Sequence, residues 1–405
     1  MGGGASGLTA AVAARAHGAQ VTVLERMDRV GKKILATGNG RCNLSNVDLD
    51  ITHYHGLNPK FAYSALSRFN YERTKEYFTK LGIAWQVEDE GKIFPASGQA
   101  ASVLDVIRYE LERLGVDIRC DYAVSDIEPV KGGFIVRSTK GLAYRAHRVI
   151  LASGGQAAPN LGSNGSGYAL AQGLGHHVVP PFPALVQLKL SADFLKRLSG
   201  VKFIGTAELI VQNKSLISKT GEILFTDYGI SGPPILALSR TAVERLRQGE
   251  QVILKLNLIN YLSKRELIAY MTKRLQEQAS KTLEFSFVGW LNKRLTPVLL
   301  KEAGVRNINK LAGQVTLEER NDIIDILQDW RLNITDAHTW QQAQVTAGGI
   351  EVREVEQKTL ASKLVPGLYF AGEILDIDGD CGGYNLQWAW SSGFISGTSA
   401  AITEI

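Results

Sequence analysis

The chain has 405 residues, of which 45% are hydrophobic and 21% charged, a composition typical of a globular protein with two or three packed domains. No stretch approaches about 18 uninterrupted apolar residues, and no charged-then-apolar leader precedes the first glycines, so neither membrane spanning nor secretion is indicated. The formal net charge of +5 mildly favours anionic ligands, but Lys and Arg are scattered among acids, and we expect no nucleic-acid partner.

The chain opens on a glycine-rich turn, Met1-Gly-Gly-Gly-Ala-Ser-Gly7, with the G-x-G-x-x-G spacing of a dinucleotide-binding loop. In such a loop the glycines permit the turn, the approach of a pyrophosphate and close packing of the next helix. Residues 8–15 predict that helix, and residues 20–24 predict a strand that ends at Glu25, where a carboxylate is expected to hold a ribose diol. The strand that should lead into the loop is missing, and we expect the natural protein to begin upstream of Met1.

Helical spacing of apolar residues predicts helices within 57–81 and 99–114. Short alternating runs between residues 116 and 146 predict a β-meander. The apolar run 147–155 ends on small residues, as a parallel strand does when its carboxyl end faces a ligand. We therefore expect this run to re-enter the nucleotide-binding sheet.

Pro180-Pro-Phe-Pro183 marks a predicted domain boundary. Residues 184–260 alternate in the manner of strands and predict a β-rich domain, whereas residues 261–344 are mainly helical in pattern. Ser263-Lys-Arg-Glu266 has the form of a capping box that starts the first of these helices. The predicted organisation is α/β, with a discontinuous nucleotide-binding domain over 1–183 and 345–405.

The segment Gly367–Gly393 is the most specific part of the sequence, because it combines an apolar strand, a glycine loop and a helix that opens at Tyr384-Asn385. Its chemistry suits a flavin. The strand end can deliver Gly372 and Glu373 beside the ribityl phosphate, and the start of the helix can aim N–H groups at the pyrimidine carbonyl, which stabilises negative charge on a reduced flavin.

Together with the segments Gly31–Asn43, Gly91–Pro95 and Thr346–Ile350, this signature resembles the YhiN/BaiN-like family of NAD(P)/FAD-dependent oxidoreductases, which includes aminoacetone oxidase-like flavoproteins. The resemblance covers essentially the whole chain. It implies a Rossmann-like, glutathione-reductase-like FAD domain with an inserted β-barrel domain, here 184–260, and a helical domain, here 261–344. FAD is the implied cofactor. No second G-x-G-x-x-G follows a strand, so NAD(P)H is expected only as a transient electron donor.

The resemblance also implies which residues contact the cofactor. The turn glycines and Ser6 line the pyrophosphate, Glu25 binds the adenosine ribose, and the Val124 backbone meets the adenine. The expected cofactor-binding residues are Gly2, Gly4, Ala5, Ser6, Gly7, Glu25, Arg26, Lys33, Gly40, Arg41, Cys42, Asn43, Val124, Ala152, Ser153, Gly154, Gly372, Glu373, Gly383, Tyr384, Asn385 and Leu386.

The reactive candidates each have a structural alternative. Arg41 and Asn43 either orient a substrate at the flavin edge or brace their glycine-rich loop. Tyr384 either donates a proton beside the flavin or packs as an aromatic cap on the loop. No catalytic residue is assigned beyond these three candidates.

The three cysteines, Cys42, Cys120 and Cys381, lack metal-ligand spacing, which suits a reducing, cytoplasmic setting. A redox dithiol formed by Cys42 and Cys381 lacks the C-x-x-C spacing of disulfide reductases, so separate thiols are favoured. His53 and His55 are interpreted as an exposed loop rather than a metal site, and no metal is expected.

The expected activity is hydride transfer between flavin N5 and a small organic substrate. The family resemblance offers two reactions: reduction of a conjugated enone, as in bile-acid reductases, or oxidation of an amine with dioxygen, as in aminoacetone oxidases. The sequence does not choose between them, and it leaves the oligomeric state open. The alternative function is a flavin-bearing binding or redox-sensing protein with little turnover.

Overall fold

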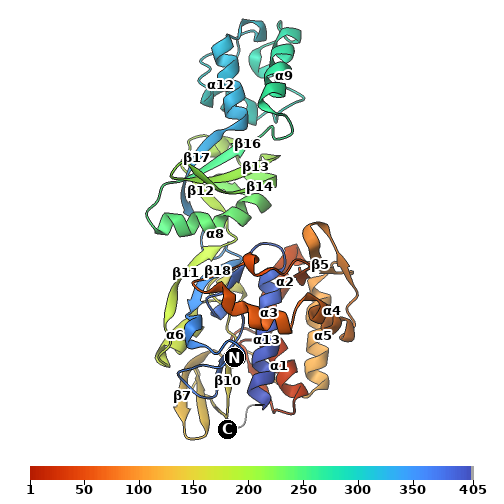
Figure 1. The fold of residues 1–405 in the computed structure, drawn as a ribbon, viewed down its shortest axis with the longest axis vertical. Helices are drawn as coiled ribbons and strands as arrows, with labels where there is room; N and C mark the ends of the chain where they lie inside the picture. Colours follow the sequence, from red (N-terminus) through yellow and green to blue (C-terminus); the bar gives the residue numbers. More distant parts are fainter. Residues whose placement is uncertain (403–405) are drawn as a thin grey trace. The chain divides into compact units, whose positions relative to one another are not determined.

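The computed structural model describes residues 1–402. The chain divides into two compact units, of which the first comprises Met1–Pro183 and the segment that starts at Trp340 (Figure 1). The second unit is Ala184–Thr339. Each unit has its own sheet and core and is described separately.

The centre of the first unit is built from two parallel strand pairs. Strand β1 (Thr22–Leu24) pairs with β6 (Asp117–Arg119), and β10 (Val149–Leu151) pairs with β19 (Leu368–Phe370). The backbone of the first two residues bridges the pairs, because the Met1 amino group donates to the Ile150 carbonyl and Gly2 N–H donates to the Leu24 carbonyl, both at 2.8 Å. The glycine turn therefore starts between the two pairs.

Of two expectations about these strand pairs, one is confirmed and one is wrong. The pairing of β10 with β19 confirms that the run after residue 147 re-enters the nucleotide-binding part of the chain. The assignment of residues 116–119 to the meander is wrong, because they form β6 and pair in parallel with β1. A strand that follows a helix returns parallel to the strand before that helix, and this long-range pairing overrides the local alternation.

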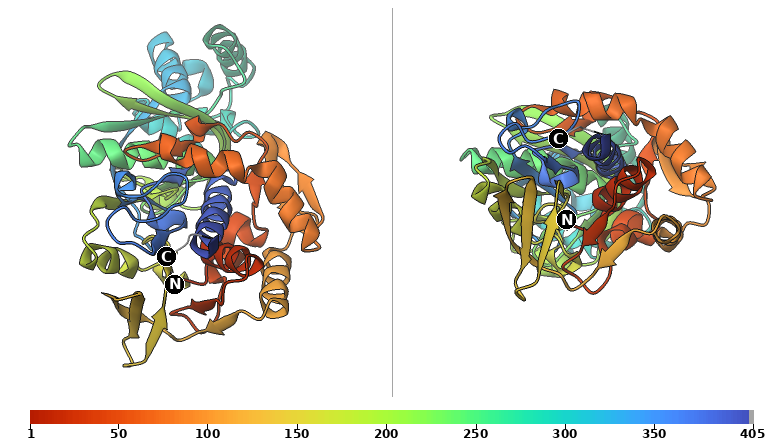
Figure 2. Two further views of the ribbon diagram at one scale, coloured as in Figure 1. Left: turned by 60° about the horizontal axis from the view of Figure 1, so that its bottom comes forward. Right: turned by 90° about the horizontal axis from the view of Figure 1, so that it is seen from below.

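Helices α1 (Ala5–Ala16) and α13 (Tyr384–Ile402) lie side by side in every view (Figures 1 and 2). Glycines permit this contact. An added Cβ at Gly393 would lie 2.4 Å from the Ser6 carbonyl oxygen, and one at Gly397 would lie 2.2 Å from that of Ala10. Real Cβ atoms do not approach so closely, so the two helices need glycine here.

The remaining elements of the first unit range from two-residue strands to the 14-residue helix α5. The predicted helix over 57–81 is divided in two where Asn70 caps a new helix by accepting from Arg73 N–H. The helices are α2 (Lys32–Ala36), α3 (Tyr63–Arg68), α4 (Tyr71–Lys80), α5 (Ala100–Arg113) and α6 (Ser166–Gly173). The strands are β2 (Ser45–Asn46), β3 (Tyr54–His55), β4 (Trp85–Val87), β5 (Lys92–Pro95), the meander β7 (Val124–Val130), β8 (Gly133–Ser138) and β9 (Ala143–Ala146), then β11 (Val178–Ala184), β18 (Val345–Ile350) and β20 (Asp378–Gly379).

The second unit contains a closed barrel with the strand order β12-β15-β14-β13-β16-β17. Its core includes the fully buried rings of Phe225 and Trp330, whose centroids are 5.6 Å apart. The strands are β12 (Leu188–Leu190), β13 (Lys202–Val211), β14 (Lys214–Phe225), β15 (Gly229–Ser231), β16 (Val252–Asn257) and β17 (Trp330–Ala337). The helices are α7 (Leu195–Leu198), α8 (Pro233–Arg247), α9 (Lys264–Glu277), α10 (Leu283–Ser286), α11 (Leu295–Glu302) and α12 (Leu317–Gln328).

The barrel differs from the expected pattern of strands over 184–260 followed by helices over 261–344. A helix, α8, interrupts the strands, and it begins at Pro233-Pro234, where proline suits the first helical turn. The last barrel strand, β17, lies beyond the helices and closes the barrel against β12. The predicted capping box is confirmed, because Ser263 and Glu266 exchange both capping hydrogen bonds at the start of α9.

Within residues 1–402, no helix combines the length and apolar character needed to cross a membrane.

Candidate functional site

The glycine turn places the N-terminus of α1 against open space. No side chain of the described residues caps this helix, so its first N–H groups are available to a ligand. A Cβ added at Gly4 would meet no described atom within 4 Å, whereas one at Gly7 would lie 1.9 Å from the Gly2 carbonyl oxygen. The turn is therefore closed on its protein side and open at Gly4, as an anion-binding turn requires.

The carboxyl ends of β1, β10 and β19 converge on this turn. Ala152 N–H donates to the Met1 carbonyl at 2.9 Å, and Ser6 Oγ donates to the Ala371 carbonyl at 3.3 Å. A Cβ at Gly372 would lie 2.4 Å from Ser6 Oγ, so this glycine allows the strand end to pass close to α1. The predicted residues in these segments are Gly2, Gly4, Ala5, Ser6 and Gly7 in the turn and helix, and Ala152, Ser153, Gly154, Gly372 and Glu373 after the strands.

Glu25 lies at the end of β1, as expected, and is 8% exposed. Its carboxylate accepts from Gly3 N–H at 2.7 Å and from Met27 N–H at 2.8 Å. These bonds fix the glycine turn to the strand end, so Glu25 supports the turn directly. Its expected contact with a ribose is a further role that stays a prediction.

Lys33 and Glu373 form an ion pair of 2.8 Å that spans the two halves of this unit. Glu373 also accepts from Thr346 N–H at 2.7 Å, and Thr346 Oγ1 accepts from the N–H groups of Gln156 and Ala157. Lys33 therefore neutralises a carboxylate in the structure, and its expected contact with the cofactor stays a prediction. The completely buried Thr346 was not among the expected site residues, although its Thr-Ala-Gly-Gly-Ile segment was one of the recognised motifs.

The loop 40–43 contains three candidates with different surroundings. Arg41 pairs with Glu88 and lies 4.2 Å above the Phe94 ring, contacts that brace the loop. Complete burial raises the pKa of the Cys42 thiol to about 12. The buried Oδ1 atom of Asn43 has no hydrogen-bond partner within residues 1–402.

The loop before α13 lies next to Asn43, since a Cβ at Gly383 would be 2.8 Å from Asn43 Oδ1. Tyr384 is 5% exposed, and burial together with the nearby Asp48 raises the pKa of its phenol well above the ordinary value. The Asn385 side chain accepts from Gly379 N–H and donates to the Gly379 carbonyl, so it closes the loop on itself. The structure thus brings residues 41–43 and 383–385 together.

A cluster of His53, His55 and Asp380 holds this loop and was missed in the sequence. His53 Nδ1 lies 3.0 Å and His55 Nε2 2.8 Å from the two oxygens of Asp380. The His53 ring also stacks on Tyr384 at a centroid distance of 4.3 Å. The sequence predicts an exposed loop for the H-x-H pair, whereas both histidines are partly buried, and Asp380, the partner of His55, lies 325 residues further along the chain. Among the described residues, no group of His, Cys, Asp and Glu is arranged to hold a metal ion.

Four predicted residues are placed by other contacts. Arg26 donates to the Gly162 carbonyl at 3.2 Å, and Val124 pairs with Ser138 in the meander. Gly40 adopts a left-handed φ of +83° that favours glycine, and Leu386 packs against a buried cluster under α13.

These features fit an FAD-type dinucleotide. The uncapped α1 N-terminus and the open Gly4 suit a pyrophosphate, while the unpartnered Asn43 oxygen is an acceptor beside the loop of Gly383 and Tyr384. A buried acceptor is costly to leave unpaired, so an N–H or O–H group of a bound molecule would satisfy it.

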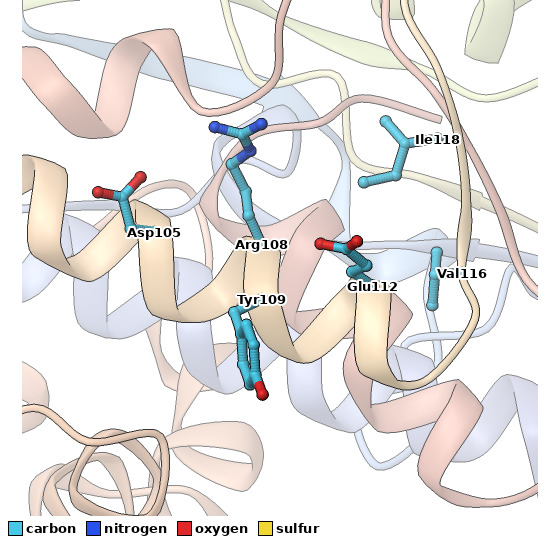
Figure 3. Close-up of a pocket in the computed structure, with 6 residues that line it drawn as sticks. All are labelled: Asp105, Arg108, Tyr109, Glu112, Val116 and Ile118. Atoms are coloured by element: carbon cyan, nitrogen blue, oxygen red, sulfur yellow. The ribbon is translucent and has the colours of Figure 1, made fainter.

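A separate hollow of about 420 Å³ lies beside α5 and contains none of the expected site residues. Its lining is Asp105, Arg108, Tyr109, Glu112, Val116 and Ile118. Arg108 and Tyr109 point in opposite directions from the helix (Figure 3). Because its side chains do not converge on one point, the hollow lacks the convergent polar groups that a catalytic site needs.

Comparisons with known proteins agree with this architecture. Residues 1–399 match the family model described as HI0933-like protein Rossmann domain. The chain is 40% identical to the 3-dehydro-bile acid delta(4,6)-reductase of Clostridium scindens, over 99% of this chain and 98% of that protein. It is 30% identical to the ribosomal RNA dihydrouridine synthase of Escherichia coli, over 97% of this chain and 94% of that protein.

Among solved structures, the 3-ketosteroid delta1-dehydrogenase from Sterolibacterium denitrificans is similar in fold, with a TM-score of 0.50 and 13% identity over 99% of this chain and 98% of that one. At this identity the likeness concerns the fold alone. The family match spans nearly the whole chain, and the glycine turn and its convergent strand ends have the form that such a family requires. The chain therefore belongs to the HI0933-like family of FAD-dependent oxidoreductases.

Proposed function

We propose that this protein reduces a carbon–carbon double bond conjugated to a carbonyl group. The observation that carries the proposal is a chemistry shared by two relatives that align with almost the entire chain. The name of the delta(4,6)-reductase describes a 3-dehydro-bile acid whose double bonds are conjugated to a ketone. Dihydrouridine likewise differs from uridine by reduction of a double bond conjugated to a ring carbonyl. One reaction, addition of a hydride and a proton across a polarised double bond, describes both names.

Different segments of the chain would bind the cofactor and the substrate. When bound, FAD supplies the hydride from its reduced ring. The α1 N-terminus and the open face at Gly4 would bind the pyrophosphate. The side-chain oxygen Oδ1 of Asn43 would accept a hydrogen bond from the bound molecule. The loop of Gly383 and Tyr384 would lie where the substrate meets the flavin ring.

Tyr384 is the proposed source of the proton that reaches the α-carbon of the substrate. The stacked His53 ring fixes the orientation of the phenol. Burial raises its pKa and so makes it a weaker acid than a free phenol, which limits the rate that it can support. Arg41 is less suited to this task, because Glu88 and Phe94 occupy its guanidinium.

A small enone is the first candidate substrate, because the relative with 40% identity is named for one. A uridine in ribosomal RNA is the second, because relatives from Escherichia coli and Haemophilus influenzae, each 30% identical, carry that name. Amine oxidation, the other reaction that the family resemblance allowed, has no counterpart in these names.

An anaerobic half-reaction tests the proposal without knowledge of the natural electron donor. The FAD-loaded protein is photoreduced and mixed in turn with a 3-oxo-4-ene steroid acid, a uridine-containing RNA fragment and the matching saturated ketone. We expect an unsaturated compound to restore the oxidised-flavin absorption and to gain two hydrogens by mass spectrometry, while the saturated ketone does neither. The oxidised protein is mixed with an amine in a parallel anaerobic experiment. If the amine bleaches the flavin and no unsaturated compound reoxidises the photoreduced protein, the reductase proposal is wrong.

Tyr384→Phe tests the proton donor in the same assay. Loss of general acid catalysis should slow flavin reoxidation by about a hundredfold or more, with unchanged flavin content. Tyr54→Phe is the matched control, because its hydroxyl only donates to the Tyr384 carbonyl. Equal slowing in both variants would assign Tyr384 a packing role instead.

A further inference from the structure

The helical part of the second unit exposes aromatic rings beside basic side chains. We define the aromatic-basic face as Tyr261, Tyr270, Lys273, Arg274, Trp290 and Lys293. Tyr261 is 65% and Tyr270 37% exposed, although large aromatic rings usually contribute to cores. Tyr270 and Arg274 are one turn apart on α9, and the Arg274 guanidinium lies 5.9 Å from the centroid of the Tyr270 ring.

The rings of this face are held in place before any partner binds. Trp290 rests on the buried Phe287 ring, with centroids 5.6 Å apart, and its Nε1 donates to the Tyr261 hydroxyl at 2.9 Å. Arg274 donates to the Tyr270 hydroxyl and to the carbonyls of Ser286 and Val288. Fixed rings lose little conformational freedom on binding, so they are suited to stacking.

Positive charge is concentrated in the same stretch. Residues 261–300 contain seven Lys and Arg residues against three Glu residues, a surplus of four, while the whole chain has a surplus of five. Lys273 and Lys293 lie at the surface. The expectation of no nucleic-acid partner rested on charges scattered over the whole chain and stays a prediction, against which this local concentration argues.

We propose that the aromatic-basic face is a docking surface for single-stranded or looped RNA. RNA offers both groups that the face complements, planar bases for the rings and phosphates for the basic side chains. An acidic peptide would use the charges but leave the fixed rings without flat partners. The inference rests on the proposed function and concerns its second candidate substrate, because such a surface would bind the RNA that carries a uridine.

The experiment measures binding of a fluorescein-labelled oligouridylate to the full-length FAD-loaded protein by fluorescence anisotropy over a range of salt concentrations. Lys273→Glu combined with Lys293→Glu reverses two exposed charges of the face, and it also removes the ion pair of 3.7 Å between Lys273 and Glu277. We expect this variant to bind at least about tenfold more weakly, with a slope of log K against log salt that is shallower by about 1.4. Lys214→Glu with Lys219→Glu, exposed on β14, changes the net charge equally and should alter the dissociation constant by less than about twofold.

Tyr261→Ala tests stacking separately from charge. It should weaken binding by about fivefold or more without changing the salt slope, because a base-stacking plane is lost but no charge. Tyr109→Ala, at a tyrosine that is 70% exposed on α5, is the matched control and should bind as the wild type does. The charge variant remains decisive if Tyr261→Ala fails to fold, since Lys273 and Lys293 are exposed.

The inference is overturned if the oligouridylate does not bind at low salt, if both charge-reversal variants weaken binding equally, or if polyglutamate or anionic vesicles bind with the same affinity. Flavin reoxidation by the steroid enone is measured on the same preparations. Enone reduction without RNA binding would reject the docking surface and leave the reductase function intact. RNA binding without reduction of any double bond would reject the reductase function and leave the docking surface intact.

Discussion

Gly4 is a residue that cofactor binding is expected to require as glycine, although the fold does not. Its φ of −87° and ψ of −171° are open to any residue, and an added Cβ would meet no described atom within 4 Å. Gly4→Ala should therefore leave the melting temperature of the apoprotein unchanged but raise the dissociation constant for FAD at least about tenfold, because the methyl group occupies the path of the pyrophosphate. Flavin fluorescence titration measures this. Gly173→Ala, in open space on α6, is the control, and unchanged FAD affinity in Gly4→Ala would place the pyrophosphate elsewhere.

Cys42 is expected to be chemically inert in the folded protein. Burial raises its pKa to about 12, so the neutral thiol persists through mildly alkaline pH and the reactive thiolate is scarce. Iodoacetamide at about pH 8.5, the ordinary thiol pKa, should label the exposed Cys381 rapidly and Cys42 only after denaturation, as followed by peptide mass spectrometry. Rapid labelling of Cys42 in the native protein would revive the redox dithiol hypothesis, which the sequence disfavoured.

At the scale of elements, Asp380 ties the loop before α13 to β3. Partial burial pushes the pKa of its carboxyl upward, but hydrogen bonds from His55 and His53 outweigh this and leave the pKa below the ordinary value. A lowered native pKa stabilises the fold above the unfolded aspartate value of about 4, and this contribution is lost as pH falls through the native value. Asp380→Asn should thus lower the melting temperature at neutral pH, with a difference from wild type that disappears in acid.

Asp48→Asn is the matched control for this tie. The Asp48 carboxylate lies 3.2 Å from His53 Nε2 and its side chain is 66% exposed, so its loss should cost less stability. Thermal melts of the three proteins across acidic and neutral pH provide the comparison. A pH-independent deficit in Asp380→Asn would mean that its charge does not support the loop.

At the scale of the whole molecule, the second unit has what an independent domain needs. Its barrel is closed, and its two ends meet, because Leu188 of β12 pairs with Ala337 of β17. The fragment Ala184–Thr339 should therefore fold alone, with a cooperative melt by circular dichroism and no FAD binding. A fragment that melts without cooperativity would show that the barrel depends on the first unit.

The glycine turn, the strand that ends at Glu25 and the capping box at Ser263 could be predicted because each is a local pattern in which residue type and spacing set the backbone conformation. The partner of β6, the strand β17 and the helix α8 could not, since strand pairing and the insertion of a helix into a run of strands are decided by distant segments.

The candidate site divides in the same way. Its glycines and the loop of Tyr384 and Asn385 were expected, but the partners of Lys33 and His55 lie 340 and 325 residues away. The sequence by itself determined the nucleotide-binding turn, the family resemblance and the order of the segments, because these depend on short motifs. Only the tertiary structure decided that Lys33 neutralises Glu373, that Asp380 holds both histidines and that Asn43 keeps an unpaired oxygen, because charge pairing and burial arise only when distant segments pack together.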